Sequence, residues 1–166
     1  MGKVLGNRSH TSWFVIAPQE VEFPRNWPLN PGACDARKRL RTAVPCFLAA
    51  GSIPVIGGFI ATGEDGLPTT LGRGGSDYTA SLAGVALGAE EVQSWTDVDG
   101  VMSADPSLID SARSLPKLSL REASELAYFG SRVLHPATML PAIEEGIPIR
   151  VLNSTRPSAQ GTLILP

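Results

Sequence analysis

The residues best suited to chemistry lie in the run Leu71-Gly72-Arg73-Gly74-Gly75-Ser76-Asp77, which combines glycines with a guanidinium, a hydroxyl and a carboxylate. The run lies where a strand passes into a helix. Glycines let the backbone approach a ligand and adopt positive φ, while the first amides of the helix and the positive end of its dipole favour an anion. Arg73 can hold a carboxylate through paired hydrogen bonds. The run therefore predicts an anion site. A glycine-rich loop considered by itself is explained equally well as a simple tight turn.

Two further polar clusters follow expected secondary structure. Thr96 to Asp99 comes directly after a strand expected at Glu91 to Trp95, and Phe129 to Pro136 precedes an expected helix. In open α/β sheets, ligands bind at the C-terminal edge of the strands. We therefore expect the Thr96 to Asp99 loop to lie at a ligand-binding edge.

The elements that must position the first cluster are predicted from apolar patterns, glycines and prolines. They are a strand at 13–17, a basic helix from Asp35 to about Ala50 that Pro45 breaks or kinks, one buried strand at Ile53–Ile60, a hairpin tip at 63–66, and a helix capped by Ser76 that runs to about Leu87.

The second part of the chain shows the same alternation. The expected elements are a helical turn at Asp105-Pro106, a capping box at Ser119 to Glu122 that starts a helix, a helix from His135-Pro136 to about Glu145, a strand at Ile147–Leu152 and a short edge strand at Gly161–Leu165. Alternating strands and helices predict an α/β fold, a three-layer αβα sandwich with a mostly parallel sheet.

Composition restricts the function classes. With 43% hydrophobic and 18% charged residues, the 166 residues suit a globular domain or part of one. The net charge of −2 disfavours a nonspecific partner such as nucleic acid or a membrane surface. Cys34 and Cys46 are too few for a disulfide scaffold and have no metal-ligand spacing, and the apolar stretches are shorter than the roughly 18 residues of a membrane span. We expect a cytoplasmic protein with inert cysteines.

From about Ile53 onward the chain resembles the second half of the kinase domain of aspartokinase, a member of the amino-acid kinase superfamily. The matching segments are Gly58-Phe59-Ile60, Thr70 to Tyr78, Trp95-Thr96-Asp97-Val98-Asp99-Gly100-Val101, Asp105-Pro106, Glu125 to Gly130, and Val133-Leu134-His135-Pro136. The resemblance implies the amino-acid kinase fold, present in part.

The resemblance also implies an activity and the residues that serve it. The reaction is phosphoryl transfer from ATP, with Mg²⁺, to the β-carboxylate of L-aspartate, giving 4-phospho-L-aspartate for lysine, threonine and methionine biosynthesis. Such a transfer needs groups that position anions and neutralise their repulsion. The resemblance implies that the substrate-binding residues are Arg73, Gly74, Gly75 and Ser76. It implies that the nucleotide-binding residues are Thr96, Asp97, Met102, Ser107, Arg132 and Val133. The implied catalytic residues are Asp77, which organises the cation, and Arg132, which faces the phosphates. No metal ligand is assigned.

Several of these residues have a structural interpretation as well. Ser76 can cap its helix, and Asp77 can be a first-turn carboxylate that satisfies the helix dipole. Thr96 and Asp97 can end a strand in an Asx turn. His135 is interpreted as a helix cap rather than a base, because a carboxylate nucleophile has no proton to lose.

The chain also departs from the family pattern. The family's phosphate-binding Lys-Phe-Gly-Gly-Thr segment does not occur in it, Arg132 stands where lysine is common, and Met102 and Ser107 replace a tyrosine and an arginine. Residues 1–32 resemble no segment of the family and are left unassigned. We expect residues 33–166 to be the C-terminal half of a kinase domain, with no ACT domain after it.

This pattern predicts a truncated or split aspartokinase with little or no activity by itself. It would form a homo-oligomer or associate with a chain that supplies the missing half. A noncatalytic nucleotide-binding or subunit-association remnant is the alternative, and a superfamily kinase acting on carbamate, glutamate or a nucleoside phosphate is a third possibility.

Overall fold

The computed structural model describes residues 13–16, 31–62, 67–105, 107–128 and 136–165. The chain divides into two compact units, Met1–Gly88 and Ala89–Pro166. Both contain helices and strands, and parallel pairs outnumber antiparallel ones among the described strands. The predicted α/β class with a mostly parallel sheet is therefore confirmed. Among the described helices, none combines the length and apolar character needed to cross a membrane.

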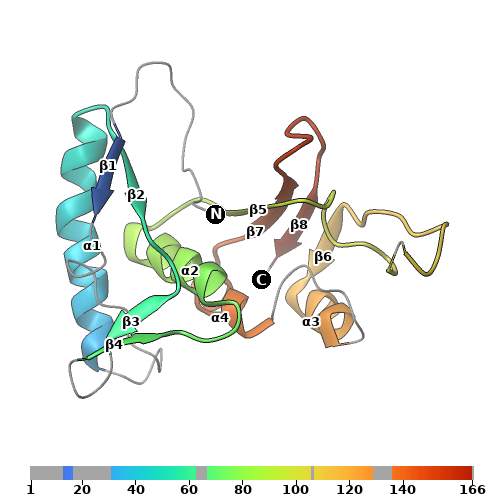
Figure 1. Cartoon of the computed structure of the whole chain (residues 1–166), viewed down its shortest axis with the longest axis horizontal. Coiled ribbons are helices and arrows are strands. Elements are labelled where there is room, and N and C mark those ends of the chain that lie inside the picture. The colour runs from blue at the N-terminus through green and yellow to red at the C-terminus, as the bar shows by residue number, and fades with distance from the viewer. Residues whose placement is uncertain (1–12, 17–30, 63–66, 106, 129–135, 166) are drawn as a thin grey trace. The chain divides into compact units, whose positions relative to one another are not determined.

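The first unit is built on a β-α-β arrangement (Figure 1). Its elements are β1 (Trp13–Ile16), α1 (Pro31–Ala49), β2 (Ile53–Ile56), β3 (Ile60–Thr62), β4 (Pro68–Thr70) and α2 (Gly75–Leu87). β1 pairs with β2 in parallel, and β3 pairs with β4 as an antiparallel hairpin. The predicted strand is thus confirmed over residues 13–16, as are the hairpin and the helix to Leu87, while residue 17 and the hairpin tip at 63–66 lie outside the described residues.

The predicted break at Pro45 is wrong, since α1 continues through it to Ala49, while the alternative of a kink stays a prediction. A proline inside a helix removes one hydrogen bond and costs about 3 kcal/mol. Leu40 and Val44 of α1 are buried against Leu82 and Ala86 of α2. This packing offsets the lost bond, as burying an aliphatic side chain contributes about 1.5–3 kcal/mol.

The single buried strand predicted at Ile53–Ile60 is wrong, because the chain divides it into β2 and β3. Residues of β2 are half-buried rather than buried. Phe59, between the strands, has φ of 78°. That left-handed conformation ends the extended backbone and sends β3 off to pair with β4.

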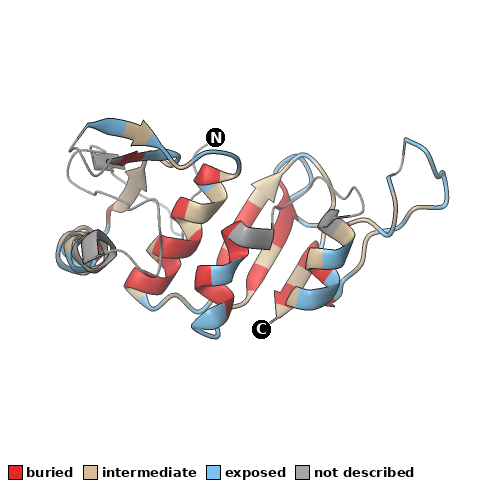
Figure 2. Cartoon of the chain, turned by 90° about the horizontal axis from the view of Figure 1, so that it is seen from below, coloured by how far each residue is buried: buried red, intermediate tan, exposed pale blue. Residues whose placement is uncertain are grey.

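The second unit is a four-stranded sheet with order β5-β7-β8-β6. Its elements are β5 (Val92–Thr96), β6 (Lys117–Ser119), α3 (Leu120–Tyr128), α4 (Pro136–Glu144), β7 (Ile149–Asn153) and β8 (Thr162–Leu165). β5 runs parallel to β7 and β6 parallel to β8, while β7 and β8 are antiparallel. Buried residues line the inner face of α4 and much of β7 and β8 (Figure 2).

Two expectations for this unit need correction. β8 was expected at an edge but lies between β7 and β6. β6 was not predicted, because a three-residue strand next to Pro116 carries too short a pattern. Pairing with β6 is what makes β8 internal.

The capping box at the start of α3 is confirmed. The Glu122 carboxylate accepts hydrogen bonds from the Ser119 amide and hydroxyl, both at 2.8 Å, and the Glu122 amide donates to Ser119 Oγ at 3.2 Å. The bonds from the Ser119 amide and then its hydroxyl lower the pKa of Glu122 below its ordinary value.

Candidate functional site

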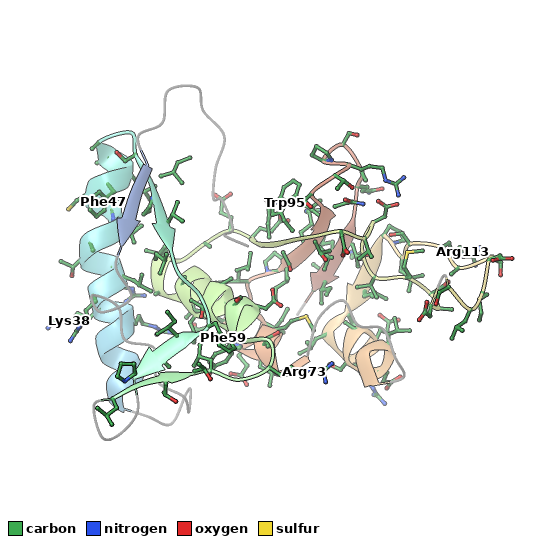
Figure 3. All side chains as sticks on the ribbon, in the orientation of Figure 1. Lys38, Phe47, Phe59, Arg73, Trp95 and Arg113 are labelled. Atoms are coloured by element: carbon green, nitrogen blue, oxygen red, sulfur yellow. The ribbon has the colours of Figure 1, made fainter. Side chains whose placement is uncertain are left out.

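The glycine run forms the loop between β4 and α2, as its composition predicted. Gly72 and Gly74 have φ of 77° and 74°, which glycine adopts without strain. The Gly75 amide donates to the Gly72 carbonyl at 3.0 Å, closing the turn. Arg73 is exposed, and Figure 3 shows it projecting from this loop. The loop thus presents one cation beside the N-terminus of a 13-residue helix.

Ser76 is not the helix cap, which corrects the prediction. Gly74 is the N-cap residue, and no side chain makes the capping hydrogen bond. The reason is the αL conformation of Gly74, which starts the helix at Gly75 and leaves Ser76 exposed inside the first turn. Asp77 lies in the same turn and is half-buried. Because no side chain caps this end of the helix, the positive end of the helix dipole stays available to an anionic ligand.

Phe59 packs against this loop through both its backbone and its ring. Its carbonyl accepts from the Leu71 amide at 2.8 Å, and its amide donates to Thr79 Oγ1 at 3.2 Å. The buried Thr79 hydroxyl donates in turn to the Gly75 carbonyl at 2.8 Å. A Cβ added at Gly75 would lie 2.9 Å from the Phe59 ring, so only glycine fits beneath it.

Sequence reasoning missed Thr79 as a residue that shapes the site. It had no local signal, because its partner Phe59 is 20 residues away and a threonine in a helix usually bonds only the carbonyl four residues earlier. Phe59 is the signal that could have pointed to Thr79. It follows a glycine at a point where the chain turns, and a residue in such a strained conformation needs a hydrogen-bond partner to fix it.

In the second unit, Thr96 and Asp97 lie at the C-terminal end of β5, as predicted. Thr96 Oγ1 donates to Asp97 Oδ1 at 3.1 Å. Thr96 is half-buried and Asp97 is exposed. β5 and β7 run parallel and end together at Thr96 and Asn153, so the loops that follow them share one edge of the sheet. Trp95, the residue before Thr96, lies on β5 (Figure 3).

Met102 and Ser107 lie on an excursion between Val101 and Leu115. The Leu115 amide donates to the Val101 carbonyl at 2.9 Å, which closes the base of the excursion. Met102 forms a bridge with Ser114. Ser107 is exposed, and both its amide and its hydroxyl donate to Asp105 Oδ1, at 2.9 and 2.6 Å. The capping role expected of Asp105 is thus confirmed, while Pro106 lies outside the described residues.

Arg132, Val133 and His135 lie outside the described residues. The site is therefore described as two separate loops, one in each unit. Within the described part of the chain, no group of three or more His, Cys, Asp or Glu side chains could hold a metal ion.

Comparison with known proteins identifies relatives of both units together. Residues 16–153 match the model of the Amino acid kinase family. The chain is similar to aspartokinase 1, chloroplastic, of Arabidopsis thaliana, with 53% identity over 114 residues that make up 68% of this chain and 20% of the relative. It is also similar over all 166 residues to the aspartokinase of Schizosaccharomyces pombe, with 36% identity and 32% of that relative covered.

A solved structure gives the same result. The crystal structure of Escherichia coli aspartokinase III in complex with aspartate and ADP matches with a TM-score of 0.79 and 37% identity, covering 93% of this chain and 35% of that one. The resemblance to aspartokinase and the amino-acid kinase fold are thereby confirmed. The chain spans a fifth of the length of the Arabidopsis relative and about a third of the fission-yeast one.

Proposed function

Because the chain belongs to the amino acid kinase family, we propose that it is the C-terminal half of an aspartokinase kinase domain, residues 33–166, and serves phosphoryl transfer from ATP to L-aspartate. The observation that carries the proposal is the glycine loop before α2. Arg73 and a helix end without a side-chain cap meet there, which suits the carboxylate of a small acidic substrate.

The roles of the residues follow from phosphoryl-transfer chemistry. Arg73, Gly74, Gly75 and Ser76 hold aspartate, so that its β-carboxylate stays fixed as the nucleophile. Thr96 and Asp97, followed by Met102 and Ser107, contact the nucleotide. Arg132 and Val133 complete the nucleotide site, where the guanidinium balances charge on the phosphates.

Mg²⁺ enters with ATP and neutralises the charge of the phosphates. This ion keeps several water and phosphate ligands and takes only one or two carboxylates from a protein. Asp77 is the carboxylate that we propose to organise it, from the first turn of α2. The half-buried position of Asp77 suits this role, because its carboxylate stays within reach of a hydrated ion.

We propose that turnover requires the Lys-Phe-Gly-Gly-Thr half of the domain, supplied by another chain or by a longer form of this one. In the family the lysine of that segment binds the phosphates, and these 166 residues contain no such segment. The 166-residue chain by itself would then bind Mg-ADP and turn over little or no substrate. The cytoplasmic setting and an oligomeric state remain predictions.

A complementation assay tests this function. The purified chain is mixed with a separately expressed N-terminal half of the Arabidopsis relative, and acyl phosphate formed from ATP, Mg²⁺ and L-aspartate is measured. We expect activity only when both halves are present, and a loss of at least about 100-fold with Arg73→Ala, since one charged, bidentate contact to a reacting substrate contributes several kcal/mol.

The matched control is Arg121→Ala. It removes the same charge from a side chain that is 90% exposed on α3 and should leave the activity unchanged. Nucleotide binding without rescue would indicate the noncatalytic remnant instead. Activity on glutamate, carbamate or a nucleoside monophosphate in place of aspartate would indicate another kinase of the family.

A further inference from the structure

The turn after β5 is held by the segment that follows β7. The Thr96 carbonyl accepts two hydrogen bonds from Ser154, one from its amide at 2.8 Å and one from its hydroxyl at 2.9 Å. Further along the turn, Asn153 Nδ2 donates to Asp99 Oδ1 at 2.7 Å, and Arg156 pairs with the other carboxylate oxygen of Asp99. The loop that we assign to the nucleotide is therefore fastened at both ends.

Asn153 can offer Asp99 only its amide nitrogen. Its Oδ1 accepts from the Thr155 amide at 2.8 Å, the Thr155 hydroxyl at 2.7 Å and the Arg156 amide at 3.3 Å. Rotating the side-chain amide by 180° would set its NH₂ group against two backbone donors, so this orientation is fixed. Asn153 is only 3% exposed, which excludes most of the solvent from these bonds.

Asp99 is the point on which this arrangement converges. Its side chain is 27% exposed and accepts from both Asn153 and Arg156. Its own carbonyl accepts from Ser114 Oγ at 2.9 Å, which joins the turn to the far end of the excursion that carries Met102. A displacement of Asp99 would therefore disturb both segments assigned to the nucleotide.

We infer that Asn153 is a positioning residue for the nucleotide, acting through Asp99 to fix the turn that carries Thr96 and Asp97. The inference rests on the proposed function, because it needs a nucleotide at that turn. Asn153 itself does not touch the nucleotide in this account. Its contribution is to hold the turn ready, so that binding does not have to order it.

Exchanging the side-chain amide of Asn153 and the carboxylate of Asp99 tests the inference. In Asn153→Asp two carboxylates face each other, and like charges at hydrogen-bond distance repel. We expect the dissociation constant of Mg-ADP, measured calorimetrically on the full chain, to rise about tenfold or more. In the double variant Asn153→Asp with Asp99→Asn, the amide now at position 99 can donate to the carboxylate now at position 153, and affinity should return to within about threefold of the original.

Glu91→Gln is the matched destabilising control. Glu91 pairs with Arg150 at 2.8 Å, across the same two strands but just before the start of β5 rather than at its end. This change should lower the melting temperature and leave the dissociation constant unaltered. Comparing melting temperature with affinity separates positioning from general stability, because a merely structural Asn153 would change only the former.

The outcomes are distinct. An unchanged affinity in Asn153→Asp, or a double variant as weak as the single one, overturns the inference while the proposed function stands. Absence of Mg-ADP binding by the unaltered chain overturns the nucleotide assignment, and the inference with it. Weakening in the single variant with recovery in the double one supports both.

Discussion

The two candidate loops are held in different ways. The glycine loop before α2 is shaped mainly by its own backbone, through glycines with positive φ and amide-to-carbonyl bonds within the loop and to Phe59. The turn after β5 is shaped mainly by side chains from elsewhere, namely Ser114, Asn153, Ser154, Arg156 and Thr162.

This difference determines which substitutions disturb each loop. The backbone amides of the glycine loop are kept when a side chain is exchanged, so its conformation is disturbed mainly when a glycine gains a side chain. Arg73 adds its guanidinium to these amides as a separate side-chain contribution. A turn held by hydrogen-bonding side chains has a conformation that single substitutions can loosen without touching the ligand. We therefore expect the second loop to be sensitive to changes remote in sequence and the first to local ones.

The largest effect should come from Gly161→Ala, next to Thr162. Gly161 has φ of 66°, and a Cβ there would collide with the carbonyl oxygen of Val151 in β7. Left-handed strain of about 1–2 kcal/mol and overpacking of about 1–3 kcal/mol together lower the free energy of unfolding by roughly 2–5 kcal/mol. Chemical denaturation measures this loss.

Gly146→Ala is the control for that variant. Gly146 has φ of 74° in the same unit, but an added Cβ meets nothing within 4 Å. Only the strain of about 1–2 kcal/mol remains. Equal losses in the two variants would contradict the close approach at Gly161.

The next largest effect should come from Thr162→Val. The fully buried Thr162 hydroxyl accepts from the Val101 amide at 2.8 Å and donates to the Leu115 carbonyl at 2.6 Å, joining the two ends of the excursion. Losing both bonds should cost roughly 2–4 kcal/mol in the free energy of unfolding and weaken Mg-ADP binding several-fold. Thr162→Ser keeps the hydroxyl, and its affinity should stay near the original value.

Thr79→Val makes the same change in the first unit and should have a smaller effect. The Phe59 amide loses its partner, but the Gly75 carbonyl keeps the helical bond that its position in α2 provides. We expect a loss of about 1–2 kcal/mol by chemical denaturation. A loss as large as that of Thr162→Val would show that side chains hold both loops alike.

The smallest effect concerns Glu122, outside both loops. Its lowered pKa in the folded state means that it stabilises the fold above its unfolded pKa, and that this contribution disappears as the pH falls through the folded pKa. In Ser119→Ala the hydroxyl bond is lost, so the pKa of Glu122 should rise toward its ordinary value. An NMR titration of the Glu122 side-chain carboxyl carbon measures it, and an unmoved midpoint would contradict the capping-box account.

The same contrast explains what could be predicted from the sequence. The glycine loop, the helix after it and the Ser119 capping box have signals within a few residues, and all were predicted. Ser114 is 15 residues from its partner Asp99, and the other side chains that hold the turn after β5 are 54 to 61 residues from theirs, as with Asn153 to Asp99 and Thr162 to Val101. Periodicity contains no information on such pairs. The αL cap at Gly74 was missed because Ser76 is the better capping residue by type, and the conformation of the preceding glycines decided the start of the helix.

The measurement that tests the account most directly is an NMR titration of the isotope-labelled chain with Mg-ADP and, separately, with L-aspartate. Each backbone amide reports on its own loop. We predict that Mg-ADP shifts the amides of residues 96–100 and that aspartate shifts those of residues 72–77. Shifts at neither loop, or shifts at the same loop for both ligands, would contradict the assignment of one loop to the amino acid and the other to the nucleotide.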